Sequence, residues 1–494
     1  MGKAWIATII CLIASASAMA QEAALEQRLV LIGEVAPKSA REIARNDWSI
    51  GTETIDRDFS RYEAWRDYLG PLGAKHARLQ SGWARTERQP GMYDFTWLDP
   101  VVAGIAADGV RPWFTLGFGN PAIPGGGSAQ RDSDLPRGAA RRAWLAYVRA
   151  IVTRYRDQVD YWELWNEPEL IGKFTAEEFG EFAAETAQTV RSAQPDATIS
   201  IAGFSGLGSA EGNAFIRQAT RTFVARGGRG LAQVVGIHIY NPRPEGANDA
   251  LDALIADLHT IDPGLVLRQG ESGAPSINQP LFALSNLWWT EEAQAKWVLR
   301  RMLNDAARGM WTSVFTLTDL HYSVAAERGA GFNASQARKT AAVALNSKGL
   351  LETRRYDPSG RNDDKQVVRA KMGYRAMQSV TSIFDARLKP VAAPCRASDA
   401  NVTVAAFRRD DGASAIVAWR SSDRPGEKPH HQSVDISCTG VRLADAPLYV
   451  DLLTSAVYRT DGVAESKGDT LQLTALPVYD APVVVSDAVL VEMW

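Results

Sequence analysis

Short apolar runs alternate with longer amphipathic stretches along most of the chain. Eight of these runs are rich in β-branched and other strand-forming residues, and we predict strands at 29–35, 74–80, 111–118, 159–166, 197–203, 233–240, 265–271 and 311–318. The stretches between them have helical spacing, most clearly 140–157 and 176–194, with Thr175 placed to cap the second helix and Pro195 to end it. Strands that alternate with helices build a parallel sheet, so the eight units predict a (β/α)8 TIM barrel.

The pattern changes after about residue 385. Alternating β-branched runs follow at 401–407, 414–420, 448–453 and 481–486, and no convincing helix interrupts them. Such a series of short strands predicts a β-sandwich. A chain of 494 residues also exceeds what one hydrophobic core usually supports. We therefore predict a barrel domain of residues 21–380, an exposed loop at 346–364 before the last barrel helix, and a β-sandwich accessory domain of residues 381–494.

The first twenty residues have the pattern of a signal peptide. Lys3 supplies a positive charge, residues 4–13 form an apolar run, and Ala18-Met19-Ala20 offers a cleavage site. We predict that residues 1–20 are removed and that the protein is exported, to the periplasm or out of the cell. The apolar run is too short to span a bilayer, and no later stretch reaches the roughly 18 apolar residues that a transmembrane helix needs.

The amino-acid composition indicates which classes of partner the protein could bind. The net charge is −3 and no tract of lysine or arginine occurs, which argues against a nucleic-acid partner. Fifteen tryptophans and thirteen tyrosines could supply faces that stack on sugar rings, although most of them are expected in the core. Cys395 and Cys438 follow the signal peptide, and they either form one disulfide or remain two separate buried thiols.

The end of the fourth predicted strand carries the first candidate acid. Glu167 lies where Pro168 ends the strand, because proline cannot donate to a sheet ladder. Active sites of barrels lie at this end of the strands, and Asn166 offers an amide that can bond a sugar hydroxyl. Two neighbouring acids are alternatives. Glu163 lies deeper in the strand and is interpreted as structural, whereas Glu169 follows in the loop and is expected to be solvated.

The second candidate acid, Glu271, ends the seventh predicted strand and is followed by small residues that leave room for a substrate. Strands four and seven lie across the barrel mouth from each other, so the two carboxyl groups can converge. Hydrolysis of a glycosidic bond with retention needs such a pair about 5–5.5 Å apart. A solvated strand-end carboxylate is the alternative for each acid. No His-Glu-x-x-His, Cys-x-x-Cys or strand-linked Gly-x-Gly-x-x-Gly motif is present, so we predict neither a metal nor a cofactor.

With Asn166-Glu167-Pro168 closing strand four and Glu271 closing strand seven, the chain resembles the clan of retaining glycosidases with (β/α)8 barrels. Within that clan it most resembles glycoside hydrolase family 39, the β-xylosidase and α-L-iduronidase type. Residues 91–99 and 371–377 are similar to the family's stretches before strand three and at the barrel-closing helix. The resemblance implies that Glu167 is the general acid/base, with a raised pKa in the free enzyme, and that Glu271 is the nucleophile.

The resemblance also implies roles around these acids. Tyr240, at the end of strand six, would hydrogen-bond the nucleophile and help keep it ionised, and Arg78 on strand two would place a positive charge beside it. His238 would touch the substrate or the acid, with a packed core histidine as the equal alternative. Four tryptophans are candidate platforms for a sugar ring, each with packing in the core or a loop as the alternative: Trp83, Trp288, Trp289 and Trp311.

The sequence therefore predicts an exported retaining glycoside hydrolase that acts on a carbohydrate by a two-step mechanism. The resemblance favours a β-linked pentose or hexose, with xylosides first, but Glu169 and residues 170–174 differ from the run found in the family's β-xylosidases. Two alternatives stand beside this prediction: an endo-acting glycanase of the same clan, and a non-catalytic carbohydrate-binding protein on the same fold.

Overall fold

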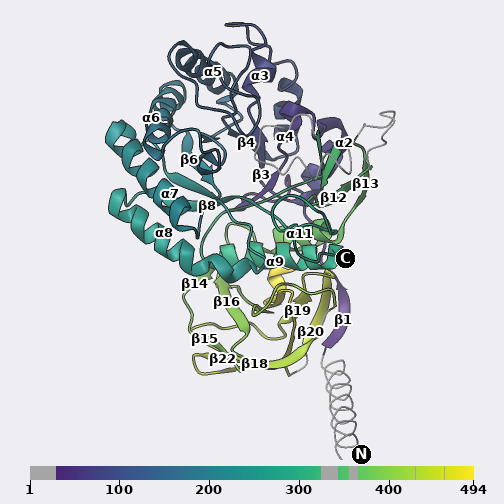
Figure 1. The fold of residues 1–494 in the computed structure, drawn as a ribbon. Coiled ribbons are helices and arrows are strands. Elements are labelled where there is room, and N and C mark those ends of the chain that lie inside the picture. Colours follow the sequence, from purple (N-terminus) through teal and green to yellow (C-terminus); the bar gives the residue numbers. More distant parts are fainter. Residues whose placement is uncertain (1–28, 324–342, 355–364, 429, 461) are drawn as a thin grey trace, which may run out of the picture.

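The centre of the molecule is a closed barrel of parallel strands (Figure 1). The computed structural model describes residues 29–323, 343–354, 365–428, 430–460 and 462–494, and the signal peptide predicted at 1–20 lies outside them. The barrel strands are short and almost wholly buried, as expected for strands covered by helices. In order they are β2 (Trp48–Gly51), β3 (His76–Gln80), β4 (Arg111–Thr115), β5 (Tyr161–Glu163), β6 (Thr198–Phe204), β7 (Val234–His238), β8 (Val266–Ser272) and β9 (Thr312–Val314).

Helices surround the barrel (Figure 1). The helices predicted at 140–157 and 176–194 are confirmed as α5 and α6, and the start of α6 follows from a capping box. There, the Thr175 hydroxyl accepts from the Glu178 amide while the Glu178 carboxylate accepts from the Thr175 amide. The longer helices are α2 (Tyr62–Leu69), α4 (Asp99–Ala107), α5 (Ala139–Tyr155), α6 (Ala176–Ala193), α7 (Ala210–Phe223), α8 (Asn248–Ile261), α9 (Glu291–Ala307) and α11 (Met372–Ile383).

The prediction of the first barrel strand at 29–35 is wrong. That segment forms β1 (Leu29–Glu34), which pairs antiparallel with β20 (Ala456–Thr460) of a C-terminal sheet, and the first barrel strand is β2. The burial of the two strands explains the difference, because β2 is buried throughout, whereas Val30, Leu31 and Ile32 on β1 are exposed.

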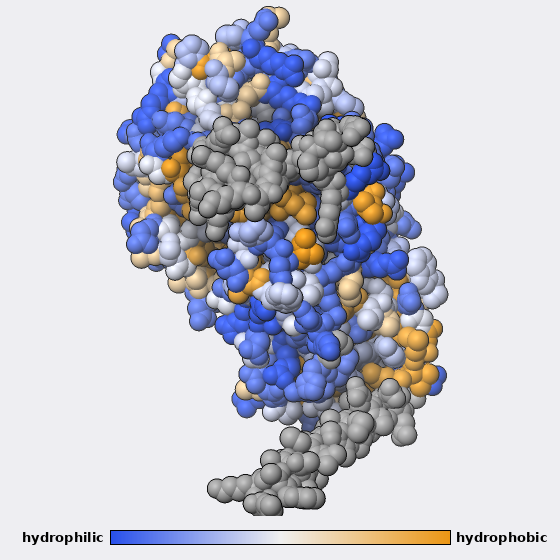
Figure 2. All heavy atoms as spheres, turned by 45° about the vertical axis from the view of Figure 1, so that its right-hand side comes forward, coloured by the Kyte–Doolittle hydropathy of each residue, from blue (hydrophilic) through white to orange (hydrophobic). Residues whose placement is uncertain are grey.

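Figure 2, which turns the right-hand side of Figure 1 forward, shows a mostly hydrophilic surface with an apolar patch low on the right.

The exposed loop predicted at 346–364 is also wrong for the residues that the structure describes there. Ser347 and Lys348 are buried, and Leu351–Thr353 forms β12, which pairs with β13 (Val367–Ala370). Just before them, β10 (Leu320–Ser323) pairs with β11 (Val343–Asn346). Residues 343–353 are therefore paired in strands or buried, instead of forming a solvent-exposed loop.

The C-terminal region consists of two antiparallel sheets (Figure 1). The seven-stranded sheet has the order β1-β20-β19-β23-β17-β16-β14 and the four-stranded sheet the order β15-β18-β22-β21. Buried residues of both sheets and of the barrel belong to one hydrophobic cluster. The strands are β14 (Lys389–Val391), β15 (Cys395–Ala397), β16 (Val402–Arg408), β17 (Ser414–Arg420), β18 (Gln432–Thr439), β19 (Leu448–Asp451), β20 (Ala456–Thr460), β21 (Ala464–Lys467), β22 (Thr470–Val478) and β23 (Val483–Ser486).

Cys395 and Cys438 form a disulfide, which decides between the two alternatives left open by the sequence. They stand directly opposite each other on β15 and β18, with their Cα atoms 4.1 Å apart.

Among the helices of the described residues, none combines the length and the apolar character that crossing a membrane requires.

Candidate active site

Glu167 lies where β5 gives way to a short turn at the mouth of the barrel. Its amide donates to Gly203 O, and Pro168 begins the turn Pro168–Leu170, so the strand cannot continue. Glu167 itself has φ 48° and ψ 53°, a left-handed conformation that is costly for a residue with a side chain. The fold thus holds this carboxyl group in a strained position, with the whole residue only 6% exposed.

Glu271 lies on β8 and is approached by His238 at the end of β7 and by Tyr240 just after it. The Tyr240 hydroxyl donates to Glu271 Oε1 at 2.5 Å, and His238 Nδ1 lies 3.8 Å from Glu271 Oε2. Burial, followed by the negative charge of Glu271, raises the pKa of Tyr240, so this phenol remains a donor. The structure therefore places Tyr240 against the candidate nucleophile, as predicted.

Arg78 on β3 links four acceptors in the floor of the site. Its NH1 donates to Glu53 at 2.9 Å and to Glu271 at 2.8 Å. Its NH2 donates to Glu163 at 2.7 Å and to Asn166 Oδ1 at 2.8 Å. The guanidinium is completely buried, so these charge-assisted bonds fix the candidate nucleophile and Asn166 relative to each other.

The two candidate catalytic carboxyl groups converge on His238. His238 Nδ1 lies 3.2 Å from Glu167 Oε1, and one atom each of Glu167, His238 and Glu271 lie within 4.8 Å of one another. The carboxyl groups of retaining glycosidases lie about 5–5.5 Å apart and those of inverting ones roughly 6.5–9.5 Å apart, so this approach of two carboxyl oxygens favours the retaining arrangement. The same three groups could also hold a metal ion, so the absence of a metal stays a prediction.

The electrostatics of Glu167 differ from the expectation. Burial raises the pKa of its carboxyl group, but the hydrogen bond with His238 and the charges of Arg131, His238 and Arg78 outweigh burial and hold the pKa at about 2. Arg131 lies 3.5 Å from Glu167 Oε2. For His238 burial lowers the pKa, but the charge of Glu271 and the hydrogen bond with Glu167 raise it overall. The contact between the two side chains therefore lowers the pKa of the Glu167 carboxyl group and raises the pKa of the His238 imidazole.

Comparisons with known proteins place this geometry in a wider context. No family model matches the chain. In sequence it is 26% identical over 247 residues to the intracellular exo-α-(1→5)-L-arabinofuranosidase of Streptomyces lividans, a match that covers 47% of this chain and 34% of that protein. The chain thus matches about a third of the length of this curated relative.

Solved structures match over nearly the whole chain. A family 39 glycoside hydrolase from Bacteroides cellulosilyticus WH2 is 16% identical, with a TM-score of 0.57 over 90% of this chain and 81% of that one. A monomeric β-xylosidase from Caulobacter crescentus is 16% identical, with a TM-score of 0.56 over 92% and 97%. The chain has the fold of these glycoside hydrolases. The same fold occurs in a family 30 subfamily 8 xylanase from Clostridium acetobutylicum, at 14% identity and a TM-score of 0.52 over 92% and 98%.

On this glycoside hydrolase fold, the two competing acids beside Glu167 have other partners. Glu163 is fully buried and accepts from Arg78 and from the Thr115 hydroxyl, in line with its interpretation as structural. Glu169 was expected to be solvated, but its carboxylate instead accepts hydrogen bonds from the backbone amides of Ser205 and Gly206. Burial raises the pKa of Glu169 to about 7.

For three of the four tryptophans considered as sugar platforms, the alternative of a packed ring holds, because buried rings offer no face to a sugar. Trp83 is completely buried and donates to Glu87. Trp311 packs with Trp113 and Tyr161 at the opposite end of the barrel strands, and Trp289 is 2% exposed. Trp288 is 65% exposed with its indole bonded to Glu427, and its role stays a prediction.

Sequence reasoning missed three ionisable groups at the site, which are Glu53, Arg131 and Lys348. Glu53 follows β2, shares Arg78 with Glu271, and is buried, which raises the pKa of its carboxyl group to about 7. Lys348 lies in the segment predicted as an exposed loop. The misplaced first strand hid Glu53, and the polar neighbours of Lys348 gave no signal of burial.

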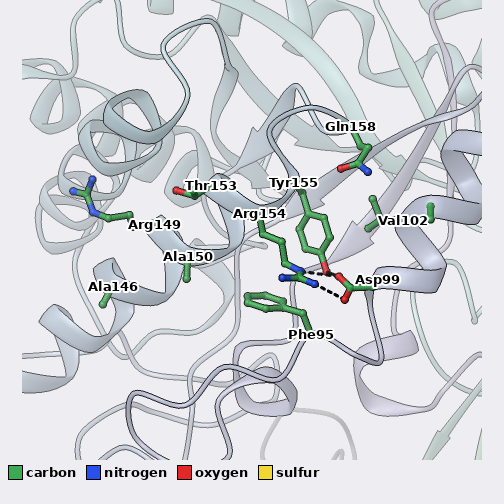
Figure 3. Close-up of a pocket in the computed structure, with 11 residues that line it drawn as sticks. Phe95, Asp99, Val102, Ala146, Arg149, Ala150, Thr153, Arg154, Tyr155 and Gln158 are labelled. Atoms are coloured by element: carbon green, nitrogen blue, oxygen red, sulfur yellow. Dashed lines mark hydrogen bonds and ion pairs between the residues drawn. The ribbon is translucent and has the colours of Figure 1, made fainter.

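A surface cavity of about 770 Å³ lies apart from these residues, between α4 and α5 (Figure 3). Its polar groups bond one another, since Asp99 accepts from Arg154 and from the Tyr155 hydroxyl. Its lining contains neither Glu167 nor Glu271, so it is not part of the candidate active site.

Proposed function

We propose that this protein is a retaining glycoside hydrolase that cleaves O-glycosidic bonds with Glu271 as nucleophile and Glu167 as general acid/base. The observation that carries the proposal is the approach of the two carboxyl groups around His238, within 4.8 Å, at the C-terminal ends of opposite barrel strands. A non-catalytic carbohydrate-binding protein would need neither this approach nor the hydrogen bonds that Arg78 and Tyr240 make to Glu271.

In the first step, Glu271 attacks the anomeric carbon while Glu167 protonates the departing glycosidic oxygen. The proton comes from the hydrogen bond between His238 Nδ1 and Glu167 Oε1, because His238 and the nearby arginines hold the pKa of Glu167 low. Asn166, held by Arg78, can bond a sugar hydroxyl, and that bond strengthens as charge develops. A glycosyl-enzyme ester on Glu271 results.

In the second step, ionised Glu167 takes a proton from water, and the oxygen of that water attacks the anomeric carbon. Glu271 leaves as a carboxylate, which Arg78 and the Tyr240 hydroxyl receive. His238 and Glu167 again hold one proton between them. Two displacements at the same carbon return the original anomeric configuration.

The proposal extends to substrate, architecture and location. We propose a β-linked pentose or hexose glycoside as substrate, supported by the β-xylosidase among the similar structures. The xylanase and the arabinofuranosidase also act on pentose glycosides, although the name of the arabinofuranosidase gives an α linkage. We propose that the two C-terminal sheets form a β-sandwich accessory domain, built from residues after 380 together with β1, and supported by their antiparallel order and shared core. Removal of residues 1–20 and export are supported by the sequence pattern at the N-terminus and by the disulfide.

Proton NMR of a hydrolysis reaction tests the stereochemical claim. A panel of aryl glycosides first identifies a substrate, and spectra taken in the first minutes then show which anomer of the free sugar forms before mutarotation. The proposal predicts that the free sugar formed first has the same anomeric configuration as the substrate. If the opposite anomer appeared first, a water between the two carboxyl groups would have attacked the sugar directly. That result would refute the assignment of Glu271 as nucleophile.

A further inference from the structure

Glu53 shares one nitrogen atom with the candidate nucleophile. Arg78 NH1 donates to Glu53 Oε1 at 2.9 Å and to Glu271 Oε2 at 2.8 Å. Each terminal nitrogen of a guanidinium group carries two hydrogens, so NH1 donates one of them to each carboxyl group. Glu53 is therefore coupled to the candidate nucleophile through Arg78.

The fold makes room for this second carboxyl group. Glu53 is 1% exposed and follows β2, whose last residue is Gly51. A Cβ atom at Gly51 would collide with the Glu53 carboxyl group. The Thr316 hydroxyl donates to Gly51 O at 2.7 Å and lies 3.4 Å from Glu53 Oε2. Because burial of a carboxyl group is costly, its place beside Arg78 is better explained by an action on that arginine than by packing.

More than one carboxyl group shares the Arg78 guanidinium. Glu53, Glu163 and Glu271 all accept hydrogen bonds from it. Burial raises the pKa of Glu53 to about 7, while the charge of Arg78 acts against this rise and the charge of Glu271 adds to it. At pH 8, above this pKa, the negative charges of Glu53 and Glu271 compete for one positive charge.

This competition affects the two steps of the reaction in opposite directions. An arginine that fully neutralises a carboxylate stabilises it, which makes the carboxylate a weaker nucleophile and a better leaving group. A second negative charge on the same arginine offsets part of that stabilisation. Glu271 then attacks the sugar more readily and leaves it less readily.

We propose that Glu53 is a positioning residue that draws part of the Arg78 charge away from Glu271, and so speeds formation of the glycosyl-enzyme and slows its hydrolysis. The proposal rests on the proposed function and goes beyond it, because it assigns a role to a residue that acts through Arg78. Glu53 needs neither contact with the sugar nor transfer of a proton for this role.

One reagent measures the two steps separately. A 2-deoxy-2-fluoro-β-glycosyl fluoride gives the rate constant of the first step from the loss of activity, and that of the second step from the return of activity after free reagent is removed. At pH 8, Glu53→Gln should lower the first rate constant by roughly 3- to 10-fold and raise the second by a similar factor. Glu53→Asp, which keeps the charge, should lie closer to the wild type in both.

Glu245→Gln is the matched control. Glu245 pairs with Arg300 on α9 at 2.6 Å and accepts from the Trp419 indole of the C-terminal sheets at 2.7 Å. This variant also removes a carboxylate from a buried arginine, and it should leave both rate constants unchanged.

The opposite signs distinguish the proposed role from a structural one, since damage to the fold would slow both steps. Changes of the two rate constants in the same direction, or no change in either, overturn the proposal and leave the glycosidase standing. A melting temperature of Glu53→Gln well below that of the wild type at pH 8 also overturns it, because Glu53 would then be retained for stability. Absence of a label on Glu271 in the wild-type protein overturns the proposed function as well.

Discussion

His238 Nδ1 lies 3.2 Å from Oε1 of Glu167, so the candidate acid and a titratable imidazole share one hydrogen bond. This contact lowers the pKa of Glu167 and raises the pKa of His238, which makes the pair one acid with two sites. The low pKa of Glu167 is compatible with its role as an acid only because the imidazole keeps the proton within reach. The pH dependence of activity therefore belongs to the pair.

The first prediction concerns that pH dependence. In the wild-type protein, kcat/KM for an aryl glycoside should fall on the alkaline side as pH rises through the pKa of His238, which lies above its ordinary value of 6.5. In His238→Gln the proton must reside on Glu167 alone, so the alkaline limb should move to lower pH. Initial rates measured between pH 4 and 10 give the alkaline limb of the pH profile for the wild type and for the variant. An unchanged alkaline limb in the variant would show that His238 does not share the catalytic proton.

Removal of the acid itself should depend on the leaving group. Glu167→Ala is expected to lose about 10²–10⁴-fold in rate on glycosides with poor leaving groups, much less on activated ones, and to recover partly with azide, which can enter the vacated space. Glu169→Gln is the matched control, because Glu169 bonds the amides of Ser205 and Gly206 instead. Equal losses in the two variants, without azide rescue, would remove the distinction between these acids.

Glu53 should make stability depend on pH. Its pKa is raised in the folded protein from 4.5 to about 7 by burial, so the folded state binds more protons than the unfolded state between these values. The stabilisation is complete below about pH 4.5 and is lost as pH rises through about 7. Urea unfolding at pH 5 and pH 8 should show a larger loss of unfolding free energy in the wild type than in Glu53→Gln, whose amide does not titrate. Glu177→Gln, at an exposed position on α6, should behave like the wild type.

The sequence predicted the barrel and its acids because both depend on local signals. Asn166-Glu167-Pro168 and Glu271 each end a buried strand, and the strands bring them together whatever the loops do. The first strand was misplaced because β1 is longer and more apolar than β2, whose four residues carry little periodicity. Only the pairing of β1 with β20, far away in the chain, reveals where it belongs.

The surroundings of the acids could not be predicted in the same way. Trp83 begins a short helix after β3 and Trp289 lies in a loop, and at either place a sugar platform and a packed ring can have the same local sequence. Only their burial in three dimensions distinguishes the two. Lys348 is preceded by polar residues that suggested solvent, yet the chain folds back there and covers it. The low pKa of Glu167 could not be predicted either, because the two residues that lower it, His238 and Arg131, come from separate segments of the chain.

Trapping the glycosyl-enzyme tests the central claim most directly. A set of 2-deoxy-2-fluoro-β-glycosyl fluorides, including the xylosyl and glucosyl compounds, slows the second step, so the ester accumulates and can be located by mass spectrometry of proteolytic peptides. The account predicts one added sugar, carried by Glu271, and no labelling in Glu271→Gln. A label on Glu167, Glu53 or any other residue would contradict it.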